Sequence, residues 1–129
     1  MIGYVMVGTN DLNRATRFYN ATLAPLGLVQ VERLETFTAY APEAAKGSIA
    51  FYVTTPFDQR PATPGNGTMV ALAAPTMQAL EQFHLAGLQS GGRDEGAPGP
   101  REDPSIIANA ATPNAENSNA PQFLEIILK

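Results

Sequence analysis

The chain has 129 residues, enough for one domain or for two half-size units that share a core, and it contains no cysteine. The lack of cysteine excludes disulfides, thiolate zinc sites and a cysteine nucleophile, and it is compatible with the reducing cytoplasm, where we expect the protein. Twelve acidic and eight basic residues give a net charge of −4, which does not favour nucleic acid, and no apolar run approaches the ~20 residues of a membrane helix.

The first half of the chain predicts a strand, a helix and three further strands. Residues 4–7 form a short apolar run that is typical of a buried strand, and Asn10 or Asp11 can cap the helix that follows. Apolar residues then recur at three- and four-residue steps, which predicts one buried helix face that ends near Pro25 and Gly27. The strand-like segments that come next cover residues 28–33, 36–41 and 48–54.

The second half repeats this order after a linker. Residues 57–66 contain Pro61 and Gly65, and such residues are typical of a connection between structured units. Thr76 is a suitable cap for a second helix that runs to Gln89. The other segments are predicted as a strand at 67–74, a loop around one short strand at 93–104, a weak strand at 105–111, a polar loop at 112–121 and a last strand at 122–128.

The two halves are in phase with one another at an offset of 65 residues. The predicted strand, helix cap, helix face and helix end coincide, which indicates a tandem pair of βαβββ modules. We therefore expect one α+β domain with a curved mixed sheet and outer helices, in which module 1 covers about 1–56 and module 2 about 67–129. The matched pairs include Val5 with Val70, Val7 with Leu72, Leu12 with Met77, Phe18 with Phe83, Leu23 with Leu88 and Gly27 with Gly92.

Four stretches of the chain resemble one known family. They are residues 5–12 together with Phe18-Tyr19 and 23–27, residues 63–75, residues 83–101, and Leu124-Glu125-Ile126. With the paired βαβββ modules, they resemble the vicinal oxygen chelate superfamily, which contains glyoxalase I, bleomycin resistance proteins and extradiol dioxygenases. The likeness is greatest to small bacterial glyoxalase-like proteins. It implies the fold more than the reaction, because this fold hosts many chemistries.

The resemblance also implies where a metal would lie. Members of the family commonly hold a divalent ion in a cup, with two histidines and two carboxylates from the first and last strands of each module. Those positions fall at Tyr4, near Phe51, at Met69 and at Glu125 in this sequence. Only Glu125 suits Zn, Ni, Fe or Mn, because a thioether is a soft ligand and a phenol would need strong activation. We therefore expect no bound metal and no other cofactor.

The candidate ligand pocket contains the same positions. Tyr4, Phe51 and Met69 are expected either to line a pocket in the vacated metal space or to pack as plain core. Glu125 would be its polar anchor or a general base, and Arg101 either reaches an anionic ligand or is solvated. His84, the only histidine, falls in the second predicted helix and is expected to pack rather than to catalyse.

Aromatic residues of module 1 add to this candidate surface. Phe37, Tyr40, Phe51 and Tyr52 all lie in predicted strands. Successive side chains of a strand point to opposite faces, so only part of this set is expected inside the cup.

The sequence therefore predicts a glyoxalase-like protein that binds a small, partly apolar molecule in the cup, as sequestering or resistance-type proteins do. One alternative is an enzyme, a lyase, isomerase or dioxygenase, which uses relocated metal ligands or Glu125 as a base. Another is a structural or regulatory module whose cup is filled by its own side chains. The resemblance also implies a homodimer, and nothing in the sequence indicates nucleic acid or a membrane as a partner.

Overall fold

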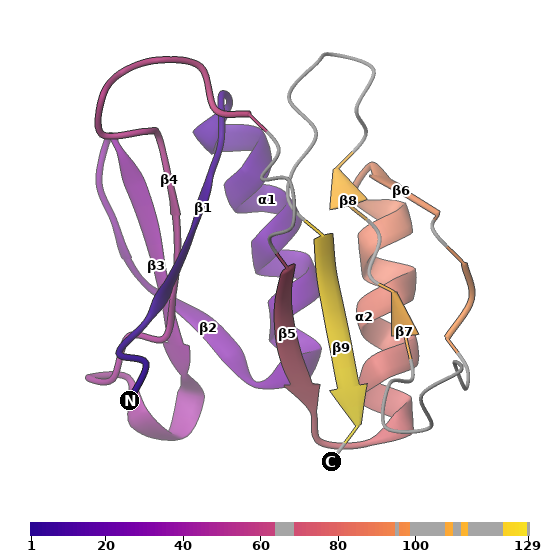
Figure 1. The fold of residues 1–129 in the computed structure, drawn as a ribbon. Helices are drawn as coiled ribbons and strands as arrows, with labels where there is room; N and C mark the ends of the chain where they lie inside the picture. The colour runs from indigo at the N-terminus through magenta and orange to yellow at the C-terminus, as the bar shows by residue number, and fades with distance from the viewer. Residues whose placement is uncertain (64–68, 95, 99–107, 110–111, 114–122, 129) are drawn as a thin grey trace.

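The computed structural model describes residues 1–63, 69–94, 96–98, 108–109, 112–113 and 123–128. Figure 1 shows the β-strands of the first half on one side of the molecule and those of the second half on the other, with the helices α1 and α2 between and behind them. The predicted α+β fold is confirmed, and the order strand, helix, strands occurs in both halves.

The first half forms a four-stranded sheet in the order β1-β4-β3-β2. Strands β1 and β4 run parallel, whereas β4 with β3 and β3 with β2 run antiparallel. The pairing of β2 with β3 contains a β-bulge between Gln30 and Glu32. The elements of this half are β1 (Val5–Gly8), α1 (Leu12–Leu23), the 3₁₀ turn η1 (Ala24–Leu26), β2 (Leu28–Arg33), β3 (Phe37–Pro42), the 3₁₀ turn η2 (Glu43–Ala45) and β4 (Phe51–Thr54).

Local residues fix the start of α1 and the end of η1, the 3₁₀ turn that follows it. Asp11 is the N-cap, and its carboxylate accepts a hydrogen bond of 2.9 Å from the backbone N–H of Arg14. Gly27 ends η1 with a φ of 75°, a left-handed conformation that glycine adopts without the strain of a Cβ. Of the two predicted caps, Asp11 therefore fills the position.

Asn10 has a different role, because it holds the linker between the two modules against module 1. Its side-chain amide donates to the carbonyl of Ala62 at 2.9 Å and accepts from the N–H of Ala62 at 2.7 Å. A Cβ on Gly8 would approach the Cβ of Ala62 to 3.2 Å, so the missing side chain makes room for the linker. The linker is thus held at Ala62.

The second half places its strands in two sheets, in the orders β5-β9-β7 and β6-β8. Strands β5 and β9 run parallel, as β1 and β4 do in the first half. The predicted loop at 112–121 needs a correction, because Thr112–Pro113 form the strand β8, which pairs antiparallel with the short strand β6 at Gly92–Arg93. The elements are β5 (Met69–Ala74), α2 (Met77–Gln89), β6 (Gly92–Arg93), β7 (Ala108–Asn109), β8 (Thr112–Pro113) and β9 (Phe123–Leu128).

The core lies where α1 and α2 pack against each other and against the sheets (Figure 1). Phe18 of α1 and Phe83 of α2, which are matched by the sequence offset, are each 1% exposed. The two halves thus present equivalent helix faces to one core. The other core residues are Val7, Ala15, Tyr19, Leu23, Tyr40, Phe51, Val53, Ala74 and Leu80.

Candidate functional site

The four-stranded sheet has one face against α1 and one face turned away from it. The hydroxyls of Thr38 in β3 and Thr16 in α1 share a buried hydrogen bond of 2.7 Å. The hydroxyl of Tyr40, two residues further along β3, donates to Asn20 of α1 at 3.0 Å. Strand residues alternate between faces, so Phe37, one residue before Thr38, belongs to the opposite face. We call this opposite side of the sheet the open face.

Three aromatic rings form a row across the open face. The rings of Tyr4 and Tyr52 are 5.1 Å apart at an interplanar angle of 71°, and those of Phe37 and Tyr52 are 5.5 Å apart at 72°. Both contacts are edge to face, an arrangement that aromatic quadrupoles favour. Tyr4 is 55% exposed, and Met6, which is in register with Tyr52, is 50% exposed. The row is therefore a preassembled apolar surface that remains accessible.

Phe51 does not share this surface. It is 1% exposed, and its ring lies 5.2 Å from that of Tyr19 in α1. Adjacent residues of a strand point to opposite faces of the sheet, so with Tyr52 on the open face, its neighbour Phe51 in β4 points into the core. Of the aromatic residues named from the sequence, Phe37 and Tyr52 thus lie on the open face, and Tyr40 and Phe51 lie in the core.

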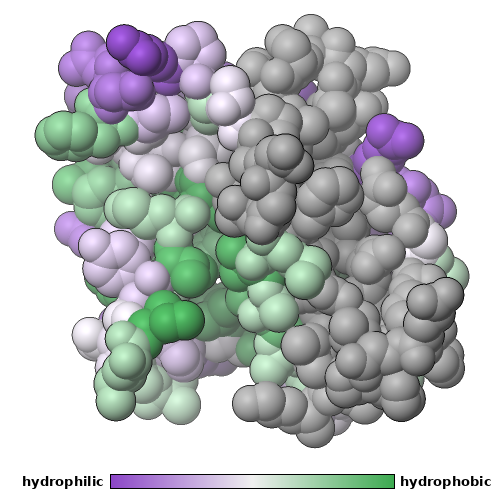
Figure 2. Space-filling model, in the orientation of Figure 1, coloured by the Kyte–Doolittle hydropathy of each residue, from purple (hydrophilic) through white to green (hydrophobic). Residues whose placement is uncertain are grey.

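The first strand of the second half carries its own exposed face. In β5, alternate residues pack toward the core, namely Val70, Leu72 and Ala74. The remaining residues of the strand are exposed, and the first of them, Met69, is 59% exposed. Figure 2 shows hydrophobic residues gathered over β1 and β5 on this side of the molecule. Met69 therefore lies at the surface, as Tyr4 does.

Two predicted site residues lie in the last part of the chain. The backbone of Glu125 lies in β9, in register with Ala71 of β5, and Phe123 is in register with Met69. Along β9, the backbone position of Glu125 is thus two residues beyond Phe123, the residue paired with Met69. Arg101 lies outside the described residues.

His84 is largely buried in α2 and close to one carboxylate. Its Nε2 is 3.9 Å from Oδ1 of Asp94, and its side chain is 13% exposed. Its Nδ1 is buried without a hydrogen-bond partner among the described residues. At 3.9 Å this is a loose ion pair at most, and the same Asp94 oxygen accepts from the N–H of Gly96 at 2.9 Å. We assign His84 a packing role.

Two tyrosines of the core are kept neutral by burial. Burial raises the pKa of Tyr19 far above its usual range, and the neighbouring Tyr40 raises it further. Burial also raises the pKa of Tyr40, against the opposing effect of the Arg33 guanidinium. The hydroxyl of Tyr40 has partners, whereas that of Tyr19 has none among the described residues. Neither phenol can serve as a base near neutral pH.

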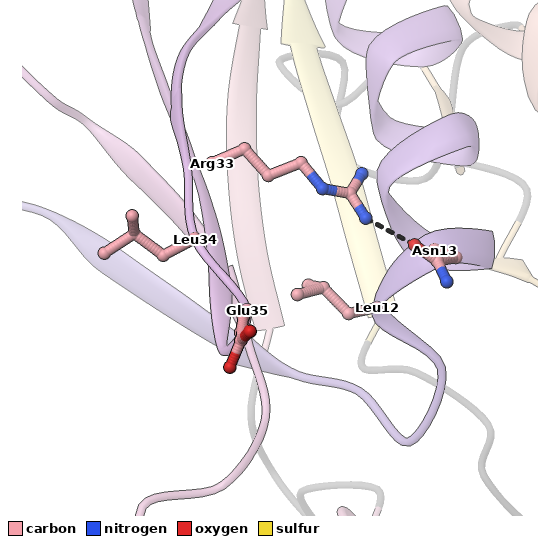
Figure 3. Close-up of a pocket in the computed structure, with 5 residues that line it drawn as sticks. All are labelled: Leu12, Asn13, Arg33, Leu34 and Glu35. Carbon is pink, nitrogen blue, oxygen red and sulfur yellow. Dashed lines mark hydrogen bonds between the residues drawn. The ribbon is translucent and has the colours of Figure 1, made fainter.

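Two cavities lie away from the open face. One, of about 610 Å³, opens between the start of α1 and the end of β2 (Figure 3). Arg33 reaches across it and donates to the side-chain oxygen of Asn13. Its lining residues are Leu12, Asn13, Arg33, Leu34 and Glu35. The other, of about 360 Å³, lies beside the linker and includes Asn10 and Arg60. The sequence patterns indicated neither cavity.

Within the described ranges, no group of three or more histidine, cysteine, aspartate or glutamate residues is placed to hold a metal ion. No helix in the described part of the chain is both long and apolar enough to cross a bilayer.

Solved structures match this arrangement. The chain is similar to a glyoxalase/bleomycin resistance protein from Albidiferax ferrireducens T118, with 29% identity, a TM-score of 0.78, and coverage of 100% of this chain and 98% of that one. A glyoxalase-related enzyme from Fulvimarina pelagi matches at 14% identity and a TM-score of 0.68, with 100% and 88% covered. A glyoxalase/bleomycin resistance protein/dioxygenase family enzyme from Burkholderia phytofirmans PsJN matches at 16% and 0.62, with 98% of each chain covered. No protein-family model and no curated protein matches the sequence.

The fold and the exposed sheet faces define a class, the paired-module α+β proteins of the glyoxalase type. The whole-chain likeness at 29% identity and a TM-score of 0.78 carries the assignment further. This likeness supports the assignment to the vicinal oxygen chelate superfamily, the group of glyoxalases, bleomycin resistance proteins and dioxygenases, that the sequence led us to expect.

Proposed function

We propose that this protein binds a small, partly apolar molecule on the open faces of its sheets, and that it does so without a divalent metal. The observation that carries the proposal is the row of Tyr4, Tyr52 and Phe37, whose rings pack on one another and yet remain partly exposed. Apolar side chains that cluster at a surface are typical of ligand or partner sites.

The other contacts in the proposal come from the second half of the chain. Met69 supplies a flexible apolar wall, and methionine adapts well to ligands of irregular shape. Glu125 is the proposed polar anchor, because it is in register with Ala71, which lies two residues after Met69 in β5. Arg101 is kept as a second polar contact on sequence grounds alone.

The metal-free part of the proposal rests on the chemistry of the donor set. The positions that hold the metal in the family carry Tyr4, Met69 and Glu125, and β4 offers only Phe51 or Tyr52. One carboxylate with a thioether and exposed phenols does not fit Zn, Ni, Fe or Mn, which need several imidazole or carboxylate ligands. We therefore derive no reaction step through a metal.

Elemental analysis tests this part directly. Protein purified without chelators is expected to contain well under one equivalent of any transition metal. A stoichiometric content of Ni, Zn, Fe or Mn, retained through gel filtration, would instead favour an enzyme with relocated ligands.

Ligand binding tests the site itself. A fragment library screened by amide NMR should give shifts that gather on β1, β3 and β4. Tyr52→Leu removes the middle ring of the row and both edge-to-face contacts, so affinity should fall about tenfold. Phe57→Leu, at a fully exposed aromatic residue of the linker, is the matched control and should leave affinity unchanged. Equal losses in the two variants would contradict the assigned site.

An enzyme remains the second candidate, and Glu125→Gln separates it from a binding protein. A sequestering protein should keep most of its affinity, because the amide retains size and hydrogen bonding. An enzyme that uses Glu125 as a general base should bind its substrate and lose its rate.

We also propose a homodimer. The strand order leaves β1 and β2 as the edges of the four-stranded sheet, and unpaired edge strands favour association. Analytical ultracentrifugation should show a species of twice the 13.7 kDa chain mass. A 13.7 kDa species that persists at high concentration would contradict this proposal.

A further inference from the structure

Among the described strand residues, one carboxylate accompanies the aromatic row on the open face. Glu32 of β2 is in register with Ala39 of β3, Ala39 with Tyr52 of β4, and Tyr52 with Met6 of β1. These four residues form one line across the sheet. Since Ala39 belongs to the open face, its partner Glu32 does so as well.

The β-bulge of β2 is the cause of this placement. Before the bulge, Gln30 accepts a hydrogen bond from Asn20 of α1 and thus lies on the helix side. In a regular strand, Glu32 would share that side with Gln30. The extra residue shifts the alternation, and the neighbour Arg33 turns to α1, where it donates to Asn13.

The described strand residues of the open face consequently carry one negative charge and no positive charge. Arg33 is directed to the helix side, and the other described strand residues of this face, such as Tyr52, Phe37, Ala39 and Met6, are uncharged. Glu32 is exposed, and none of the ion pairs found in the described part of the chain involves it. Ala39, between the ring and the carboxylate, contributes only a methyl group and is fully buried.

We propose that this face recognises an organic monocation, of the quaternary ammonium or aryl-ammonium class. Two strand spacings separate Glu32 from Tyr52, about 10 Å between their backbones, which suits a ligand whose apolar part lies on the rings. Its positive centre then lies between the face of Tyr52 and the carboxylate, attracted by the ring quadrupole and by the charge. This inference rests on the proposed function, which it deepens by naming the charge of the ligand.

Three probes of similar size and different charge test the inference. They are benzyltrimethylammonium, which is cationic, benzyl alcohol, which is neutral, and benzenesulfonate, which is anionic. Each is titrated into the full-length protein, and the amide resonances of residues 4–6, 37–39 and 51–54 are followed by NMR. The expected order of affinity is cation, then neutral probe, then anion.

Two charge-removing variants locate the effect. Glu32→Gln should weaken binding of benzyltrimethylammonium about fivefold and leave benzyl alcohol unchanged, because only the cation loses an attraction. Glu35→Gln is the matched control, since Glu35 is an exposed carboxylate that lines the cavity on the other side of β2. It should leave all three affinities unchanged. Unchanged amide dispersion confirms that both variants are folded.

The outcomes separate this inference from the proposed function. If benzyl alcohol binds as tightly as the cation and Glu32→Gln has no effect, the cation inference is overturned and the apolar site stands. If no probe shifts these resonances in the folded protein, both proposals fail. If the same resonances shift on dilution without any probe, the face belongs to a second copy of the chain, which also overturns the inference.

Discussion

Tyr19→Phe should stabilise the protein, although it removes a polar group from the centre of the core. The ring of Tyr19 is 2% exposed and packs edge to face on Phe18, 5.3 Å away. Its hydroxyl is buried and has no partner among the described residues. Phenylalanine keeps the ring and its packing and removes only the hydroxyl.

The expected gain follows from the cost of that hydroxyl. A buried polar group without a hydrogen bond costs about 1–3 kcal/mol. The space left by one oxygen is small and costs about 0.3 kcal/mol. The free energy of unfolding should therefore rise by about 1 kcal/mol, which corresponds to about 3–5 °C in Tm for a chain of this size.

Tyr40→Phe is the matched comparison in the same core. The hydroxyl of Tyr40 donates to Asn20 at 3.0 Å, so its loss should cost about 1 kcal/mol. Urea unfolding followed by circular dichroism gives both values. The reasoning is refuted if Tyr19→Phe destabilises the protein by as much as Tyr40→Phe does, because the Tyr19 hydroxyl would then have a stabilising partner.

Three further predictions concern pH and local structure. In the unfolded chain Tyr19 and Tyr40 ionise near pH 10, whereas burial raises the pKa of both in the folded protein. The free energy of unfolding should therefore be level below pH 10 and fall above it, by up to about 1.4 kcal/mol per pH unit for each tyrosine. Urea midpoints from pH 8 to 11 measure this fall, and Tyr19→Phe should reduce it. Asp11→Ala removes the N-cap of α1 and should lower the free energy of unfolding by about 1 kcal/mol, whereas a value near zero would mean that the cap contributes nothing. Asn10→Ala breaks both hydrogen bonds to Ala62, so chymotrypsin should cut after Phe57 in the linker faster than in the parent chain, with cutting after Phe18 in α1 as the control.

The fold could be predicted from the sequence because apolar spacing reports burial. Phe18 and Phe83 recur at helical steps in their own segments and at equal positions of the repeat, and both are buried. Asp11 supplies a side-chain acceptor that few residue types offer, and Gly27 has a left-handed conformation that few residue types adopt, so the start of α1 and the end of η1 were predictable as well. The strand β8 and its pairing with β6 were not predictable, because backbone pairing of two residues leaves no side-chain pattern.

The site was less predictable, because the face of a strand residue depends on register. Phe51, Tyr52 and Val53 are all apolar, so their sequence does not say which of them faces the helix. A shift of one residue exchanges the two faces, and the expected pocket position fell on Phe51 rather than Tyr52. Glu32 was missed for a related reason, since regular alternation from Gln30 places it on the wrong side.

The bulge in β2 gives the chain an unusual route to altered ligand preference. If β2 continued as a regular strand beyond Gln30, Val31 would oppose Ala39, Glu32 would turn to the helix and Arg33 would enter the open face. The charge on the open face would then change from negative to positive, although the amino-acid sequence of the region stayed the same. A change that merely favours or disfavours one backbone irregularity would thus convert the proposed preference for cations into a preference for anions, which makes this strand a place where evolution or design can alter specificity in one step.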